Sequence, residues 1–154
     1  FQREFDLPYT IFRFFNIYGP RQSEDFVLPR FVRAALAGNP LRIYGDGSQT
    51  RTFCYVDDTV ETCVTVHVEK ACENDVINIG SDAEISILDL ARAVIHITGS
   101  RSSIEFLPPL AEGDMSRRCP DIGKMQQLLK RPLVSLKEGI QRLVEHYANE
   151  RTEN

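Results

Sequence analysis

Residues 9–15 read YTIFRFF, a run of β-branched and aromatic side chains in which Arg13 is the only charge. A short apolar run of this kind is typical of a strand that is covered on both faces, as in a parallel sheet. Gly19-Pro20 ends the run, and residues 26–37 follow with apolar side chains at helical spacing, up to Gly38. The order of strand, loop and helix predicts an α/β fold.

Short strands are expected at four further places: residues 41–44, 50–56, 76–80 and 104–107. Gly45-Asp46-Gly47 separates the first two of these strands, and its glycines allow the positive φ angles of a hairpin turn. Only the runs at 9–15 and 76–80 have the character of doubly wound strands, and two strands do not make a sheet. Residues 1–5 resemble the last turns of an amphipathic helix. We therefore expect residues 1–154 to be the C-terminal part of a larger, doubly wound α/β protein.

Three helix starts are predicted where Ser or Asp is followed three residues later by Asp or Glu, at residues 58, 86 and 135. The first of these helices carries Val60, Val64 and Val68 on one face, and the last has an apolar face that ends at Tyr147. The polar stretch from residue 108 to residue 120 is expected on the surface, near a ligand.

The composition argues against several classes of protein. The chain has 22 acidic and 18 basic residues and a net charge of −4, so it has no basic excess for a phosphate backbone and no nucleic-acid partner is expected. Charges interrupt every apolar stretch well short of the roughly 20 residues that cross a bilayer, so no membrane partner is expected. The 4 cysteines form no C-x-x-C pair and have no nearby histidines at the spacing of a zinc finger. Reduced thiols, no metal site and a cytoplasmic location are expected.

Four polar residues stand beside the ends of predicted strands or turns: Asn16, Arg51, Asn78 and Arg118. An asparagine amide at a buried strand end needs hydrogen-bond partners, and ligand groups can supply them. An arginine can hold a phosphate or a carboxylate through two parallel hydrogen bonds. Parallel sheets bind ligands at their strand ends. Local capping and salt bridges are the alternative explanation of the same residues, and both interpretations stay open.

Three runs carry a resemblance to a known family. RFFNIYGPR at residues 13–21 resembles the R-x-x-N-x-Y-G-P motif of the extended short-chain dehydrogenase/reductase family, in its nucleotide-sugar branch. PLRIYGDGSQTRTFCYVDD at residues 40–58 and NIG at residues 78–80 are similar to two further blocks of that family, in the right order. The resemblance implies the C-terminal, substrate-binding part of an extended Rossmann-type fold. It also implies enzymes that act on UDP- or dTDP-sugars with tightly held NAD.

The same resemblance implies a set of substrate-binding positions: Asn16, Leu28, Pro29, Tyr44, Arg51, Asn78 and Arg118. Asn16 would face the sugar diphosphate, Tyr44 would pack against the pyrimidine base, and Arg51 would clamp the diphosphate with its planar fork. Phe14 would line the nicotinamide of NAD, and a core phenylalanine is the alternative for that position.

RRCPDI at residues 117–122 resembles the R-K-P-D-I run of UDP-glucuronate decarboxylases. That likeness implies an auxiliary role for Arg118 near the sugar, although Cys119 replaces the lysine of the motif. AEGD at residues 111–114 lacks the arginine that epimerases and dehydratases often carry before Gly-Asp, which disfavours those activities. Epimerase, decarboxylase and dehydratase all remain open.

In this family a hydride passes from sugar C4 to NAD, a 4-keto sugar forms, and the tyrosine of a Y-x-x-x-K motif acts as the base. The chain contains no Y-x-x-x-K and no G-x-x-G-x-x-G after a strand. We therefore expect no catalytic tyrosine and lysine in this chain, the NAD-binding half to lie upstream, and the fragment alone to be inactive. A stand-alone sugar-nucleotide binding or regulatory module is the alternative. A purely structural fragment is a third hypothesis, and a homodimer stays open because relatives dimerise through helices that lie mostly upstream.

Overall fold

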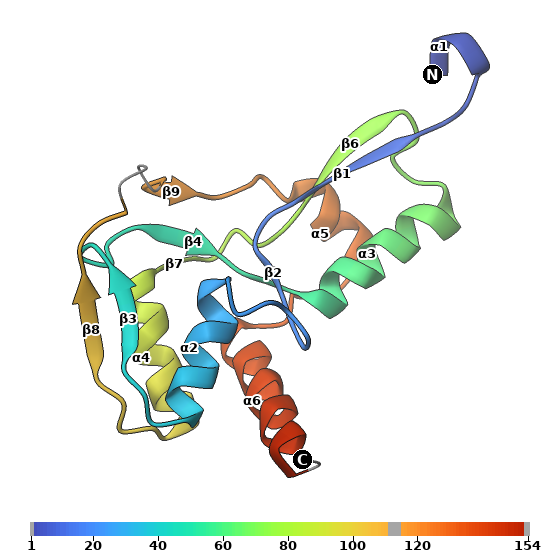
Figure 1. Cartoon of the computed structure of the whole chain (residues 1–154). Coiled ribbons are helices and arrows are strands. Elements are labelled where there is room, and N and C mark those ends of the chain that lie inside the picture. Colours follow the sequence, from blue (N-terminus) through green and yellow to red (C-terminus); the bar gives the residue numbers. More distant parts are fainter. Residues whose placement is uncertain (1, 111–114, 153–154) are drawn as a thin grey trace.

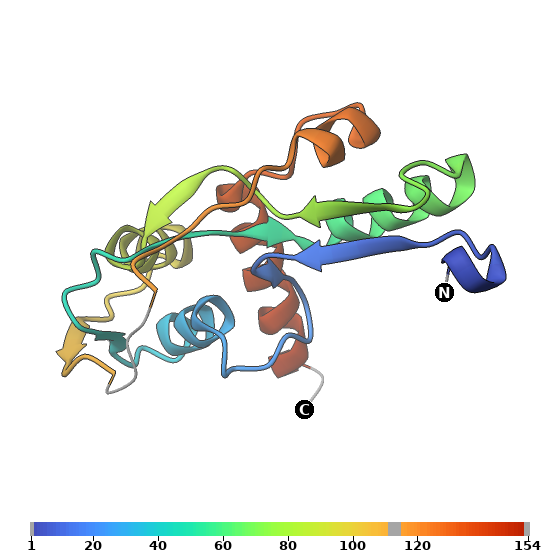
Figure 2. The same cartoon turned by 90° about the horizontal axis from the view of Figure 1, so that it is seen from above.

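The computed structural model describes residues 2–110 and 115–152, so AEGD at 111–114 lies outside the described residues. Figures 1 and 2 show two ends of the molecule. One end holds the parallel strands β1 (Thr10–Phe14) and β6 (Asp75–Ile79), with α3 (Val56–Glu69) and α5 (Gly123–Leu129) beside them. The opposite end holds β3 (Leu41–Tyr44), which pairs in parallel with β8 (Ile104–Leu107). The short helix α1 (Gln2–Phe5) precedes β1, as predicted.

The parallel pairing of β1 with β6 confirms the prediction of two doubly wound strands, and it runs from Thr10↔Asp75 to Phe14↔Ile79. The inward side chains of β6 are fully buried in a core with residues of α3 and α5. The predicted cover on both faces of β1 is wrong, because Ile11 is 49% and Phe14 54% exposed. Within the described residues β1 pairs with β6 alone. The described residues therefore leave Ile11 and Phe14 of this apolar run uncovered.

A second core lies where α2 (Val27–Leu36), α4 (Ile87–Thr98) and α6 (Leu136–Thr152) pack against one another. All three helices were expected. Ser86 caps α4 as predicted, since its hydroxyl accepts a hydrogen bond from the Asp89 amide at 3.0 Å. The Ser135 hydroxyl accepts from the Glu138 amide at 3.2 Å in the same way. Helices α2 and α4 of this core also pack against β3.

The predicted hairpin between β3 and β4 (Thr50–Thr52) is wrong. The turn itself is confirmed, because Gly45 and Gly47 have φ angles of 72° and 75°. Instead of pairing with β3, β4 lies between antiparallel β7 (Glu84–Ser86) and parallel β9 (Arg117–Arg118). The chain then continues into β5 (Cys54–Tyr55), which pairs with β2 (Ile17–Tyr18). The expected strand at 50–56 is therefore two strands in two different sheets.

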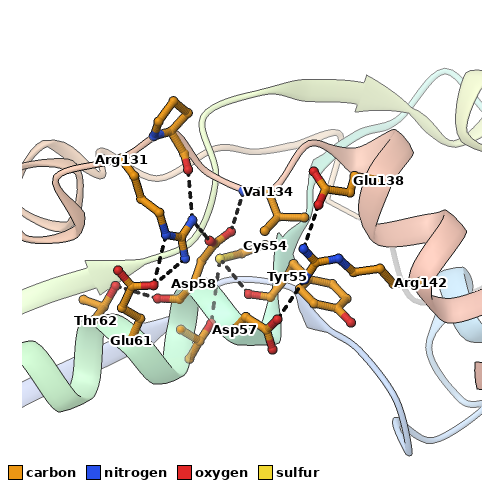
Figure 3. A network of polar contacts seen from close by, with 12 residues as sticks. Cys54, Tyr55, Asp57, Asp58, Glu61, Thr62, Arg131, Val134, Glu138 and Arg142 are labelled. Carbon is orange, nitrogen blue, oxygen red and sulfur yellow. Dashed lines mark hydrogen bonds and ion pairs between the residues drawn. The ribbon is translucent and has the colours of Figure 1, made fainter.

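Helix α3 begins at Val56, two residues before the predicted start, and Asp58 does not cap it. The Asp58 carboxylate is fully buried and accepts hydrogen bonds from Arg131 Nη1 at 2.8 Å and from the Val134 amide at 3.0 Å. Arg131 also pairs with Glu61 at 2.6 Å (Figure 3). Asp58 and Glu61, the two acidic residues that resembled a helix cap, thus connect α3 to the segment between α5 and α6.

The valine face of α3 has the predicted spacing but faces outward, with Val60, Val64 and Val68 between 54% and 70% exposed. Helix α5 and strand β7 were not expected, because elements of 7 and 3 residues are too short to show a period. No helix in the part of the chain that the structure describes is both long and apolar enough to span a membrane.

Candidate functional site

A cavity of about 510 Å³ opens between β2, the first turn of α2, β3 and β4. Its lining residues come from β2 and the residue before it, from the following loop and α2, from β3, β4 and the residues beside them, from the start of α4 and from the segment after β8: Asn16, Ile17, Tyr18, Gln22, Asp25, Phe26, Val27, Leu28, Arg30, Arg42, Tyr44, Gln49, Arg51, Phe53, Ile87 and Leu110. Four of the predicted site residues, Asn16, Leu28, Tyr44 and Arg51, therefore share one cavity. They come from segments that are distant in the sequence.

Asn16 follows β1 with a φ of 43°, a left-handed conformation that asparagine tolerates better than most residues. Its carbonyl accepts a hydrogen bond from the Cys54 amide at 3.2 Å, which joins the end of β1 to β5. Its side-chain Nδ2 is buried and has no hydrogen-bond partner among the described residues. A buried amide donor of this kind is suited to a ligand acceptor.

Tyr44 and Arg51 lie on the strand side of the cavity. Tyr44 ends β3 with 37% of its surface exposed, so its ring is accessible for stacking. Arg51 lies in the middle of β4 and donates from Nη1 to the Thr50 carbonyl at 2.8 Å. Arg42 also lines the cavity and pairs with Glu105 at 3.1 Å across β3 and β8. This wall combines an aromatic ring with two guanidinium groups.

Arg118 is the direct cross-strand neighbour of Arg51 in the pairing of β9 with β4. It is exposed, and its guanidinium lies 5.9 Å from the centre of the Phe15 ring. Like charges on facing positions of a sheet repel each other, and an anion between them would relieve that repulsion. Arg118 does not line the cavity itself, but it stands at its β4 side.

Three other predicted residues lie away from the cavity lining. Pro29 is buried in the first turn of α2. Asn78 donates from Nδ2 to the Asp121 carbonyl at 2.8 Å, which holds the segment before α5 against β6. Phe14 is exposed at the end of β1, where its ring stacks on Phe12 at 6.2 Å. The roles implied for these three residues remain predictions.

Most of the lining residues were missed by sequence reasoning, and Gln22 and Arg30 are two of these that have buried polar atoms. Gln22 donates from Nε2 to the Ile17 carbonyl at 2.8 Å, and its buried Oε1 has no partner in the described part of the chain. Arg30 likewise has a buried Nε that makes no hydrogen bond to a described residue. The only signal for Arg30 was its position beside Leu28 and Pro29. Gln22 lies in a loop, where no period marks a residue as buried.

Burial raises the pKa of two side chains in or beside the cavity, Cys54 and Tyr18. It raises the pKa of the Cys54 thiol to about 12, so this sulfur stays protonated near neutral pH and is not an activated nucleophile. It also raises the pKa of the Tyr18 phenol well above its ordinary value. Among the described residues no three His, Cys, Asp or Glu side chains are grouped as a metal site requires.

A larger cavity of about 640 Å³ lies on the other side of Phe53, between β7 and the connection to α6. Its charged and amide side chains are already engaged, because Arg131 binds Asp58 and Glu61, and Gln126 donates to Asp82 at 3.2 Å. None of the predicted site residues lines it. The smaller cavity is therefore the candidate site, because four of the predicted residues line it.

The described residues do not fit NAD by themselves. Neither β1 nor β6 leads through a glycine-rich turn into a helix, which is the arrangement that holds a dinucleotide pyrophosphate. Exposed Phe14 is the one residue for which a nicotinamide contact was predicted. The fold and the site define an α/β protein with an arginine-rich candidate cavity and, in the described part of the chain, no glycine-rich dinucleotide loop.

Comparison with known proteins agrees with this α/β fold and identifies the family. The model of the NAD dependent epimerase/dehydratase family matches residues 1–80. UDP-N-acetyl-alpha-D-glucosaminuronate decarboxylase from Bacillus cytotoxicus is 40% identical over 150 residues, covering 92% of this chain and 46% of its own. The chain belongs to the NAD-dependent epimerase/dehydratase family, and it spans between 32% and 46% of the length of curated relatives that it matches.

Solved structures show the same fold. UDP-glucose 4-epimerase from Thermotoga maritima, with UDP-glucose, superposes with a TM-score of 0.89 at 32% identity, covering 97% of this chain and 49% of that one. UDP-glucuronic acid 4-epimerase from Bacillus cereus, with UDP-glucuronic acid and NAD, gives 0.85 at 34% identity, covering 97% and 48%. The architecture is therefore that of the extended Rossmann-like epimerases, as the sequence motifs implied.

Proposed function

We propose that this chain forms the sugar-nucleotide-binding part of an NAD-dependent enzyme that converts a UDP- or dTDP-sugar through a 4-keto intermediate. The observation that carries the proposal is the single cavity of about 510 Å³ that Asn16, Leu28, Tyr44 and Arg51 line together. Its volume falls within the roughly 300–1,000 Å³ of small-molecule sites. In this proposal residues 1–154 bind the substrate.

The lining matches the chemistry of a sugar nucleotide. The Tyr44 ring offers a face for a pyrimidine, and the guanidinium groups of Arg30, Arg42 and Arg51 offer positive charge for a diphosphate. Arg118 lies beside Arg51 and is proposed to reach the sugar end of the substrate. The relatives named above carry UDP in their names or ligands, which favours uridine over thymidine.

Catalysis in this proposal requires protein that the chain does not contain. The curated relatives are two to three times as long, and residues 1–154 contain neither Y-x-x-x-K nor G-x-x-G-x-x-G. We assign NAD binding and the catalytic base to that further length, and we expect no turnover by this chain alone. Epimerisation, decarboxylation and dehydration all remain candidate outcomes. A cytoplasmic location is kept as a prediction, consistent with 4 free thiols.

Isothermal titration calorimetry on this chain tests the proposal. We expect binding of UDP and UDP-glucose, and an affinity at least about tenfold lower for Arg51→Ala, since a charge-assisted hydrogen bond contributes about 1.5–3 kcal/mol. Arg101→Ala, in an exposed loop, is the matched control and should bind as the wild type does. Absence of heat with UDP, dTDP and UDP-glucose would refute the binding role.

A stand-alone binding or regulatory module is the second candidate, favoured by the lack of Y-x-x-x-K in residues 1–154. Sequencing the transcript upstream of Phe1 separates the two. A G-x-x-G-x-x-G run and a Y-x-x-x-K motif in the same reading frame would support the enzyme. A start codon close to Phe1 would support the module.

A further inference from the structure

Strand β9 is short and lies at the edge of its sheet. It has two residues, both exposed, and within the described residues it pairs with β4 alone (Figure 1). Arg117 lies opposite Thr50, and Arg118 lies opposite Arg51. The Thr50 amide donates to the Ser116 carbonyl at 2.9 Å. Because a strand of two residues makes few backbone hydrogen bonds, its position depends on side-chain contacts.

One carboxylate joins all three strands of this sheet. Glu84 on β7 accepts a hydrogen bond from the Thr50 hydroxyl of β4 at 3.0 Å. It also accepts from Arg117 of β9, whose Nε and Nη2 lie between 2.5 and 3.1 Å from the two carboxylate oxygens. Forked hydrogen bonds between two charged groups fix orientation as well as distance. The cluster of Thr50, Glu84 and Arg117 therefore holds β9 against the other two strands.

This cluster and the two arginines beside the candidate site lie on opposite faces of the sheet. Successive residues of a strand point to opposite faces, so Thr50 and Arg117 share one face while Arg51 and Arg118 share the other. The cavities agree with this arrangement, because Arg51 lines the candidate cavity whereas Glu84 lines the larger one. Glu84 is thus placed to affect a ligand through β9 rather than by contact.

We propose that Glu84 is a positioning residue: by binding Arg117 it fixes β9, so that Arg118 presents its guanidinium at the sugar end of the bound sugar nucleotide. Like charges on facing positions of a sheet repel each other, and Arg118 faces Arg51. The ion pair on the other face offsets that repulsion. The inference rests on the proposed function and adds the residue that holds Arg118 in place.

The test is calorimetric titration of the chain with UDP-glucuronic acid and with UDP, which lacks the transferred sugar. We expect Glu84→Gln to bind UDP-glucuronic acid about three- to tenfold more weakly than the wild type and to bind UDP with unchanged affinity. Arg117→Gln removes the other partner of the ion pair and should give the same pattern. Glu145→Gln, on the exposed side of α6, is the matched control and should bind both ligands as the wild type does.

A double-mutant cycle tests whether the effect passes through Arg118. In an Arg118→Ala background, Glu84→Gln should cause no further loss of affinity for UDP-glucuronic acid, because the group that Glu84 positions is absent. A merely structural effect of Glu84→Gln would persist in that background and would weaken UDP binding as well. Circular dichroism of each variant checks that it folds.

Three results would overturn the proposal: an equal loss of affinity for both ligands, an undiminished effect of Glu84→Gln in the Arg118→Ala background, or unchanged affinities in both single variants of the ion pair. With a wild type that binds UDP, each of these results refutes the positioning role alone. Binding of neither ligand by the wild type would refute the proposed function, and the Glu84 inference with it.

Discussion

At the scale of single residues, Tyr18 and Gly139 depend on each other. The Tyr18 ring is buried, and its hydroxyl lies against Gly139 in helix α6. A Cβ added at Gly139 would fall on that hydroxyl and lie 2.7 Å from the ring carbon that bears it. Glycine weakens a helix interior by about 1 kcal/mol relative to alanine, so its place here reflects the close approach of the ring.

Gly139→Ala should therefore destabilise the chain, against the trend for helices, by about 1–3 kcal/mol in urea unfolding. Gly123→Ala at the start of α5 is the matched control, because the nearest atom to its added Cβ is 3.3 Å away. The free energy of unfolding of this control variant should lie within about 0.5 kcal/mol of the wild-type value. A more stable Gly139→Ala would contradict the packing described here.

Asp58 is the second residue whose loss should be costly. Removing one partner of a buried ion pair costs about 3–5 kcal/mol, and the lower end applies here because the Arg131 side chain is 35% exposed. We expect Asp58→Ala to lower the free energy of unfolding by about 3 kcal/mol in urea. Arg92→Ala breaks a pair whose side chains are 63% and 58% exposed and should change stability by less than about 1 kcal/mol. Equal effects of the two variants would contradict this account.

At the scale of elements, Glu84 and Arg117 join the two strands that flank β4. Arg117 on β9 donates to both carboxylate oxygens of Glu84 on β7, and the Thr50 hydroxyl of β4 donates to the same carboxylate at 3.0 Å. The contact holds β9, and with it Arg118, next to Arg51. Hydrogen bonds from Arg117 lower the pKa of Glu84 below its ordinary 4.5.

Because the folded pKa is the lower one, the stabilisation by Glu84 is complete above pH 4.5 and is lost as the pH falls through the folded value. Glu84→Gln should therefore be less stable than the wild type near neutral pH, and the difference should shrink on acidification. Urea unfolding from about pH 7 to about pH 3 measures it. Glu145→Gln, on the exposed side of α6, is the control. A difference that is independent of pH would argue against the pair.

The sequence predicted most elements because their signals are local. The caps at Ser86 and Ser135 and the glycine turn at 45–47 involve residues close in sequence, and all were confirmed. The hairpin was wrong because the same turn can lead to a distant partner, and β3 pairs with β8 instead. Asp58 was misread as a cap because its partner Arg131 is far along the chain.

At the scale of the whole molecule, two apolar surfaces have no cover within the described residues. Ile11 and Phe14 are exposed on β1, and Val60, Val64 and Val68 form a row along α3. A bare strand edge and an apolar helix face favour association with further protein. The chain alone should therefore self-associate as its concentration rises.

Sedimentation velocity over a range of concentrations tests this prediction. Val64→Lys places a charge in the middle of the α3 row and should shift the chain toward monomer. Gln127→Lys adds the same charge on α5, away from the row, and should leave the association unchanged. A wild-type chain that stays monomeric throughout would contradict the prediction.

The candidate site was predictable only in part. The family motifs named Asn16, Leu28, Tyr44 and Arg51, and the fold brings these four residues to one cavity. Gln22 escaped prediction because it lies in a loop, where its place in the cavity depends on the tertiary structure rather than on residue type.

The central claim is that this cavity holds a sugar nucleotide. The most direct test is an NMR titration of the ¹⁵N-labelled chain with UDP-glucose. We predict that shifted amide signals cluster at Asn16, Gln22, Tyr44 and Arg51, while Ser135, which lines the larger cavity, stays unchanged. Shifts centred on the larger cavity, or no shifts at saturating ligand, would contradict the claim.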